Sequence, residues 1–270
     1  MKIKLVTFAP HPNFGTCLQS YALNKILRDL GHDVEFIYNG RENPKWGIKD
    51  YTRYLIKSIL PAKIVQKIRE KRETTATQST QQPPVVLSLP NSKFRYYLSK
   101  MPFYNNVYKT FKCRTLQWKK VWEFTFEDGN YNMKRLYTHD QYDEVVKDAD
   151  VFITGSDQIW NPYCGGFNPM MFLEFAGEKK RIAYSSSIAR PEFPMNVRER
   201  AKKDLKKFKY IGIREQSSVG MLNDLLDRDD VRAVVDPTYL LTKEEWMDFA
   251  NRANVEFELP KKYIFCYYIG

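Results

Sequence analysis

Hydrophobic residues follow two spacings along the chain, and the spacings alternate. Short continuous apolar runs predict strands at residues 3–8 and 34–38. Between these runs, apolar side chains recur at helical spacing from Leu18 to Leu30, which predicts a helix that stops at Gly31. A strand, a helix and a second strand in this order predict a βαβ unit with parallel strands.

The same alternation returns in the second half of the chain. Strands with helices between them are typical of a parallel sheet that is covered on both faces. We therefore predict an α/β fold with a doubly wound, Rossmann-like parallel sheet, formed by residues 1–40 and 136–258. In the second half, strands are predicted at residues 151–154, 181–185, 210–214 and 231–235, and helices at 141–148, 196–208, 215–226 and 243–250.

The segment between these two parts, residues 41–135, breaks the pattern and differs in charge. It holds 20 Lys and Arg against 7 Asp and Glu, whereas the rest of the chain holds 23 against 25. The formal excess of +11 therefore comes from this segment. We interpret it as a basic, partly flexible insertion, because the polar tract at residues 73–84 has too few apolar side chains to order itself.

Residues 51–72 within the insertion mix apolar side chains with Lys and Arg in a basic amphipathic pattern. Such a helix lies on an anionic membrane, or it packs on its own domain with its lysines in water. Both interpretations fit the sequence. Nucleic acid is not an expected partner, because the chain has neither a zinc-finger spacing nor an aromatic RNA-reading motif.

Composition and motifs exclude several classes of protein and several kinds of site. No apolar run reaches the roughly 18 residues of a membrane-spanning helix. The chain enters its first strand at once, so we expect a cytoplasmic protein with at most peripheral contact with the inner face of the membrane. The four cysteines and three histidines are scattered, which predicts neither a disulfide framework nor a metal site. Because G-x-G-x-x-G is absent from the first turn, no dinucleotide cofactor is expected.

The loop after the predicted strand at residues 151–154 carries the densest set of polar side chains. A hydroxyl, a carboxylate, an indole and amides lie between Gly155 and Asn161 and include Ser156, Asp157 and Trp160. Open α/β sheets bind ligands at the carboxyl ends of their strands, so this loop predicts a site. The alternative is that its glycine and asparagine only shape a turn and its indole packs in the core.

Two further strand ends carry polar side chains that belong to the same prediction. Ser186 lies near the end of one predicted strand, and Arg214 lies at the end of the next. The carboxyl ends of parallel strands share one edge, so we expect both residues to approach Asp157. A guanidinium binds phosphate or carboxylate through paired hydrogen bonds, and the start of a following helix adds to the attraction for an anion. The competing interpretation is an ion pair of Arg214 with Glu215 or Asp236.

Five groups of residues, taken together, are more specific than any one of them. They are residues 13–23 with 30–34, 155–161, 181–187, 213–215 and 235–238. In this order they resemble the polysaccharide pyruvyl transferase family. The resemblance covers most of the chain outside the basic insertion.

The resemblance implies transfer of a pyruvyl group from phosphoenolpyruvate to hydroxyls of a sugar in a polysaccharide or lipid-linked glycan, with formation of a ketal. It implies two facing Rossmann-like domains, as in GT-B glycosyltransferases, and no cofactor besides the donor substrate. Asp157 would act as the acid or orient the sugar, Arg214 would bind the donor, and Trp160 would stack on a sugar face. Asp236 would fix the loop before Pro237. The other expected substrate-binding residues are Asn13, Gly15, Thr16, Gly155, Ser156, Asn161 and Ser186.

Residues 259–270 resemble the first strand of the family's second domain. That domain is expected to supply a histidine and further basic residues to the donor, so we expect the 270-residue chain to be weakly active or inactive alone. Two other functions fit the same pattern. One is a nucleotide-sugar glycosyltransferase of GT-B type, and the other is a non-catalytic module that binds a glycan or a membrane through the basic insertion.

Overall fold

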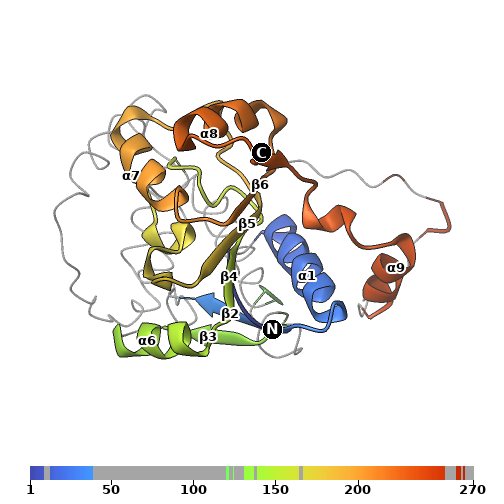
Figure 1. The fold of residues 1–270 in the computed structure, drawn as a ribbon. Helices are drawn as coiled ribbons and strands as arrows, with labels where there is room; N and C mark the ends of the chain where they lie inside the picture. Colours follow the sequence, from blue (N-terminus) through green and yellow to red (C-terminus); the bar gives the residue numbers. More distant parts are fainter. Residues whose placement is uncertain are drawn as a thin grey trace, which may run out of the picture.

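A seven-stranded sheet lies at the centre of this computed structural model (Figure 1). The structure describes residues 1–8, 13–38, 120–121, 124, 131–136, 139–163, 167–252, 260–262 and 264. The strands are β1 (Lys2–Val6), β2 (Asp33–Tyr38), β3 (Met133–Arg135), β4 (Val151–Thr154), β5 (Lys180–Ser186), β6 (Tyr210–Ile213) and β7 (Arg232–Ala233).

All neighbouring strands of the sheet are parallel, in the order β3-β2-β1-β4-β5-β6-β7. The chain moves outward from β1 through β2 to β3 and then returns to β4 on the other side of β1. This reversal between β1 and β4 is the switch point of a doubly wound sheet. The predicted α/β fold with a Rossmann-like parallel sheet is confirmed.

Helices cover both faces of the sheet (Figure 1). The α-helices among the described residues are α1 (Phe14–Asp29), α6 (His139–Asp148), α7 (Met195–Leu205), α8 (Val219–Leu226) and α9 (Lys243–Asn251). In the same part of the chain, four short 3-10 helices connect the larger elements. They are η3 (Pro169–Phe172), η4 (Glu174–Ala176), η5 (Gln216–Ser218) and η6 (Pro237–Tyr239).

The sheet separates two hydrophobic cores, because successive strand residues face opposite sides. On β1, Ile3 and Leu5 pack with buried side chains of α1, while Val6 belongs to the core that includes α7 and α8. On β4, Ile153 and Phe152 divide between the two cores in the same way. The continuous apolar runs in the sequence are therefore strands that are buried on both faces.

The structure differs from the sequence prediction at several elements. β3 lies within the range 41–135 that we predicted as an insertion, yet it pairs with β2. It is an edge strand of three residues, two of them charged, so it has no apolar run that would reveal it. β7 has two paired residues instead of five, and the helix predicted from residue 215 begins as the 3-10 helix η5 before α8.

Several predictions lie outside the described residues. They concern the basic helix at 51–72, the polar tract at 73–84 and nearly all of the strand predicted at 259–270. The GT-B-like arrangement with a second domain therefore stays a prediction. Within the described ranges, every helix falls short of the length and apolarity that crossing a bilayer requires.

A lysine on β1 joins three elements below one face of the sheet. The Nζ atom of Lys4 lies 2.7 Å from a carboxylate oxygen of Glu35 on β2 and 2.7 Å from one of Asp148 at the end of α6. Lys4 itself is buried, and burial alone lowers its pKa. The hydrogen bonds to Asp148 and Glu35 outweigh burial and hold the pKa of Lys4 above its ordinary value. Lys2 contacts the other oxygen of Asp148 at 2.5 Å.

We predict that Asp148→Asn destabilises the fold in a pH-dependent way. The hydrogen bonds from Lys2 and Lys4 lower the pKa of Asp148 from 3.8 to about 2. A carboxylate with a depressed pKa contributes stability above its unfolded pKa and loses it as the pH falls through the folded pKa. Urea unfolding should therefore show a loss in the variant at pH 7 that shrinks as the pH falls from about 4 towards about 2.

The matched control is Glu144→Gln on the same helix. Glu144 is 72% exposed at its side chain and lies 3.4 Å from Lys134, so removing its charge should change stability little. Equal losses in the two variants, or a loss in Asp148→Asn that does not depend on pH, would contradict the assignment.

Candidate functional site

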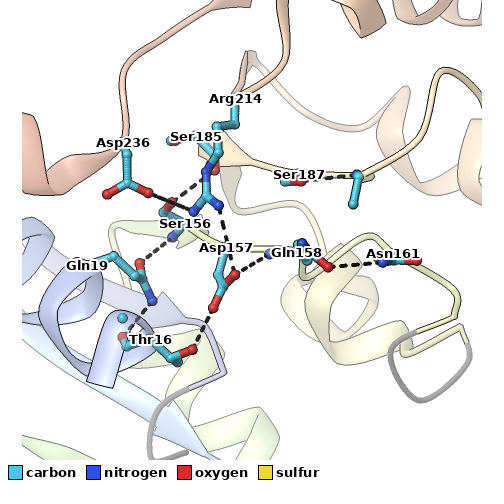
Figure 2. Close-up of polar contacts among 12 residues, drawn as sticks. Thr16, Gln19, Ser156, Asp157, Gln158, Asn161, Ser185, Ser187, Arg214 and Asp236 are labelled. Carbon is cyan, nitrogen blue, oxygen red and sulfur yellow. Dashed lines mark hydrogen bonds and ion pairs between the residues drawn. The ribbon is translucent and has the colours of Figure 1, made fainter. Parts of the chain in front are cut away.

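Polar side chains from four loops meet at the carboxyl edge of the sheet, beside the switch point between β1 and β4 (Figure 2). Thr16 comes from the first turn of α1, which follows β1, and Asp157 follows β4. Arg214 follows β6, and Asp236 follows β7. The edge thus collects residues that are up to 220 positions apart in the sequence, from Thr16 to Asp236. This is the place where open parallel sheets bind ligands.

Both carboxylate oxygens of Asp157 accept hydrogen bonds. Oδ2 accepts from the Thr16 hydroxyl at 2.7 Å, and Oδ1 accepts from the backbone N–H of Gln158 at 2.8 Å. The backbone carbonyl of Asp157 accepts from the N–H of Ser187 at 2.9 Å, which ties the loop to the end of β5. Asp157 is therefore fixed, while 21% of its side chain remains exposed.

Arg214 reaches from β6 between Asp236 and Asp157 (Figure 2). Its Nη2 atom lies 2.6 Å from the Ser156 hydroxyl oxygen and 2.7 Å from Oδ2 of Asp236. Its Nη1 atom lies 3.9 Å from Oδ1 of Asp157, which is beyond hydrogen-bond distance. The Nε atom is buried and has no hydrogen-bond partner among the described residues. The structure thus brings Arg214 and Asp157 together, and it also contains the ion pair with Asp236.

The two carboxylate oxygens of Asp236 contact different residues. Its Oδ1 atom accepts hydrogen bonds from the backbone N–H of Thr238 at 3.0 Å and from the Thr238 hydroxyl at 2.8 Å, which caps η6. Its Oδ2 atom pairs with Arg214. Asp236 therefore fixes the turn from Pro237 to Thr238 and in addition contacts the guanidinium.

A buried glutamine that sequence reasoning missed supports the site from below. Gln19 is 3% exposed, and its Oε1 atom accepts a hydrogen bond from the backbone N–H of Ser156 at 3.2 Å. Its Nε2 atom donates to the Thr7 hydroxyl and to the carbonyl of Thr16. One signal was present in the sequence, because Gln19 lies one helical turn after Thr16 and therefore on the same side of the helix.

Ser156, Ser186 and Gly155 lie inside the protein. Ser156 and Ser186 are fully buried, and the Ser186 hydroxyl donates to the carbonyl of Thr154 at 3.3 Å. The Ser186 hydroxyl is thus engaged inside the protein, and a ligand contact of this residue stays a prediction. Ser156 contacts Arg214 directly, so its hydroxyl helps to fix the guanidinium.

Asn13 and Gly15 lie at the start of α1, next to Thr16. The side-chain oxygen of Asn13 accepts from the backbone N–H of Gly15 at 2.9 Å and from that of Thr16 at 3.4 Å. Asn13 is thus the N-cap of α1, and this cap positions Thr16 towards Asp157. Both Asn13 and Gly15 are exposed, so ligand binding by either residue stays a prediction.

The predicted sugar-stacking role of Trp160 is wrong. Its side chain is 2% exposed, and its indole N–H donates to the carbonyl of Met171 at 3.1 Å. The ring stacks on Phe172 with 5.7 Å between centroids. The backbone N–H of Trp160 donates to the carbonyl of Ser187, which turns the loop inward after Asp157. The alternative interpretation, an indole in the core, is the one that the structure contains.

Asn161 shapes the turn that follows. Its side-chain N–H donates to the side-chain oxygen of Gln158 at 3.1 Å, and its side-chain oxygen accepts from the backbone N–H of Tyr163 at 3.0 Å. It is half-buried and contacts Gln158, the residue after Asp157, so a ligand contact stays a prediction. Across the described ranges, no three His, Cys, Asp or Glu side chains gather closely enough to hold a metal ion.

The family model of polysaccharide pyruvyl transferases matches residues 13–268, which is nearly the whole chain. The chain belongs to this family. The match confirms the resemblance that the five groups of residues predicted. Comparison with curated proteins found no match, and comparison with solved structures found none either. All four site residues, from Thr16 to Asp236, lie within the range that the polysaccharide pyruvyl transferase model covers.

We predict that Gly155→Ala strongly destabilises the protein. Gly155 has φ +119°, and a Cβ atom at this position would lie 2.1 Å from the carbonyl oxygen of Tyr184 on β5. Since neither atom can move away without displacing a strand, we expect a loss of about 3 kcal/mol in the free energy of unfolding. Urea denaturation of the purified variant measures this loss.

Gly220→Ala is the control for that experiment. Gly220 lies in α8, and an added Cβ would meet nothing within 4 Å. This variant should equal the wild type or exceed it by up to about 1 kcal/mol, because alanine favours the helix. A Gly155→Ala protein as stable as Gly220→Ala would show that the β4 loop is not packed against β5 in this way.

Proposed function

We propose that this protein transfers a pyruvyl group from phosphoenolpyruvate to hydroxyls of a sugar in a polysaccharide or lipid-linked glycan, forming a ketal and releasing phosphate. The family membership supports the reaction class. The observation that carries the proposal for this chain is the position of Arg214 beside Asp157 at the switch point of the sheet. A cation for an anionic donor and a carboxylate for a hydroxyl acceptor lie within reach of one small molecule.

Arg214 is the proposed donor-binding residue. Phosphoenolpyruvate carries a phosphate and a carboxylate, and a guanidinium binds either through directed hydrogen bonds. The Nη2 atom is already engaged with Ser156 and Asp236, whereas Nη1 has no hydrogen-bond partner among the described residues. With 29% of its side chain exposed, Arg214 is accessible to a ligand, and we place that contact at Nη1.

Asp157 is the proposed group that orients the sugar and accepts its proton. In the reaction, the methylene carbon of the donor gains a proton and the first sugar oxygen bonds to C2. The bond from C2 to the phosphate oxygen then breaks, and a second sugar hydroxyl attacks C2 to close the ketal. The two hydroxyls lose two protons, of which one balances the proton gained by the methylene carbon and the other leaves with the phosphate. A carboxylate base that takes up these protons and passes them on is therefore needed. The hydrogen bonds that Asp157 accepts, and Arg214 as its counter-ion, suit this role better than that of the acid.

The described site holds two carboxylates around one guanidinium. An anionic donor adds further negative charge, which a single guanidinium offsets only in part. We therefore propose that cationic groups from outside the described residues complete the donor site. This fits the expectation from the family resemblance that more basic residues contribute.

A binding experiment tests the donor. Phosphoenolpyruvate should raise the melting temperature of the wild-type chain, and calorimetry should show that Arg214→Lys weakens its binding by about tenfold or more, because an ammonium cannot keep both existing contacts and a free edge. Because we expect the 270-residue chain to be at most weakly active alone, phosphate release with a sugar acceptor is measured at high protein concentration, and Asp157→Asn should abolish whatever release the wild type shows.

Arg198→Lys is the control, since Arg198 lies on α7 and makes a surface ion pair with Glu192, which precedes this helix. It should bind phosphoenolpyruvate like the wild type. Stabilisation by nucleotide sugars but not by phosphoenolpyruvate would instead indicate a glycosyltransferase and overturn the proposal.

A further inference from the structure

The two edges of the Arg214 guanidinium have different surroundings. The Nη2 edge is anchored to Ser156 at 2.6 Å and to Asp236 at 2.7 Å. The Nη1 edge points towards Asp157 but stops 3.9 Å from its nearest carboxylate oxygen. An unrestrained guanidinium beside a half-exposed carboxylate would close to the 2.7–2.9 Å of a charge-assisted hydrogen bond. Something therefore holds Arg214 away from Asp157.

Asp236 is the residue placed to do this. Its carboxylate contacts Arg214 from the side away from Asp157, as Figure 2 shows. The Asp236 carboxylate cannot move with the guanidinium towards Asp157, because its Oδ1 atom accepts hydrogen bonds from the backbone N–H and the hydroxyl of Thr238. Ser156 is equally immobile, since it is fully buried and its backbone N–H is bonded to Gln19.

The consequence concerns both substrates of the proposed reaction. If Arg214 closed on Asp157, the Nη1 edge would be lost to the donor and the carboxylate would be lost to the acceptor. By holding the opposite edge, Asp236 keeps the donor-binding nitrogen and the acceptor-binding carboxylate apart while no substrate is bound.

We propose that Asp236 is a positioning residue, which prevents Nη1 of Arg214 from closing onto Asp157 to hydrogen-bond distance and so keeps both groups available to substrates. This inference rests on the proposed function for the identity of those substrates. The geometric part concerns only this chain and does not depend on them.

The test uses Asp236→Asn in the full chain. The asparagine oxygen can still accept the hydrogen bonds of Thr238, so the cap of η6 is retained. The amide N–H₂ then faces Arg214, donor against donor, and the ion pair is lost. We expect phosphoenolpyruvate binding, measured by calorimetry, to weaken by about tenfold.

A double-mutant cycle with Asp157→Asn separates positioning from other effects. In the Asp157→Asn background, Arg214 has no carboxylate to close upon, so Asp236→Asn should change affinity by less than about twofold. Thr238→Val is the matched control, because it removes one hydrogen bond to Asp236 and keeps the ion pair. It should bind phosphoenolpyruvate like the wild type.

Two results would overturn the proposal. Tighter donor binding by Asp236→Asn in both backgrounds would mean that Asp236 only repels the anion. An equal loss in both backgrounds, shared by Thr238→Val, would mean that Asp236 only maintains the loop.

If phosphoenolpyruvate does not bind even the wild type, a crystal structure of Asp236→Asn still tests whether Asp236 holds Arg214 away from Asp157. In that event the proposed function fails, and the position of Arg214 still answers the question. Closure of Nη1 onto Asp157 to hydrogen-bond distance supports the positioning role, and a distance that stays near 3.9 Å refutes it.

Discussion

The site depends on one side chain, the guanidinium of Arg214, being held at a fixed place above the carboxyl edge of the sheet. Its backbone N–H donates to the carbonyl of Ser186 at 2.9 Å, so the start of the side chain is set by the pairing of β5 and β6. Its far end is set by Ser156 after β4 and Asp236 after β7. Three loops that only a parallel sheet brings to one edge thus determine where a single cation lies.

Below Arg214, polar groups are satisfied inside the protein. Ser156, Gln19, Thr7 and Thr16 form a buried chain of hydrogen bonds between the ends of β1 and β4 and the first turns of α1. Each such bond contributes about 1 kcal/mol net, but leaving one buried partner unpaired costs about 1–3 kcal/mol. The network therefore adds little stability and strongly disfavours alternative positions of the loop, which keeps the site preorganised.

The sequence predicted the regular elements well because buried strands and amphipathic helices have distinct periods. β4 was predicted at its observed limits, and its loop was recognised as a site. Trp160 was misassigned because a sequence does not tell whether a loop aromatic turns inward. The deciding contact is with Met171 in η3, a 3-10 helix without a period that would predict it. Gln19 was missed because a polar residue on a helix is usually solvated.

The ion pair between Arg214 and Asp236 is better explained by geometry than by stability. The two side chains are 29% and 20% exposed, and pairs this accessible contribute only about 0–1 kcal/mol. A second carboxylate near the guanidinium that we propose to bind the donor also opposes the binding of an anion. The ion pair thus stabilises the fold little and weakens the positive potential around Arg214. We therefore explain it by the direction in which it makes the Arg214 guanidinium point. Because Asp236 lies on the side of Arg214 away from Asp157, the direction it controls is the one that leaves a gap between cation and carboxylate.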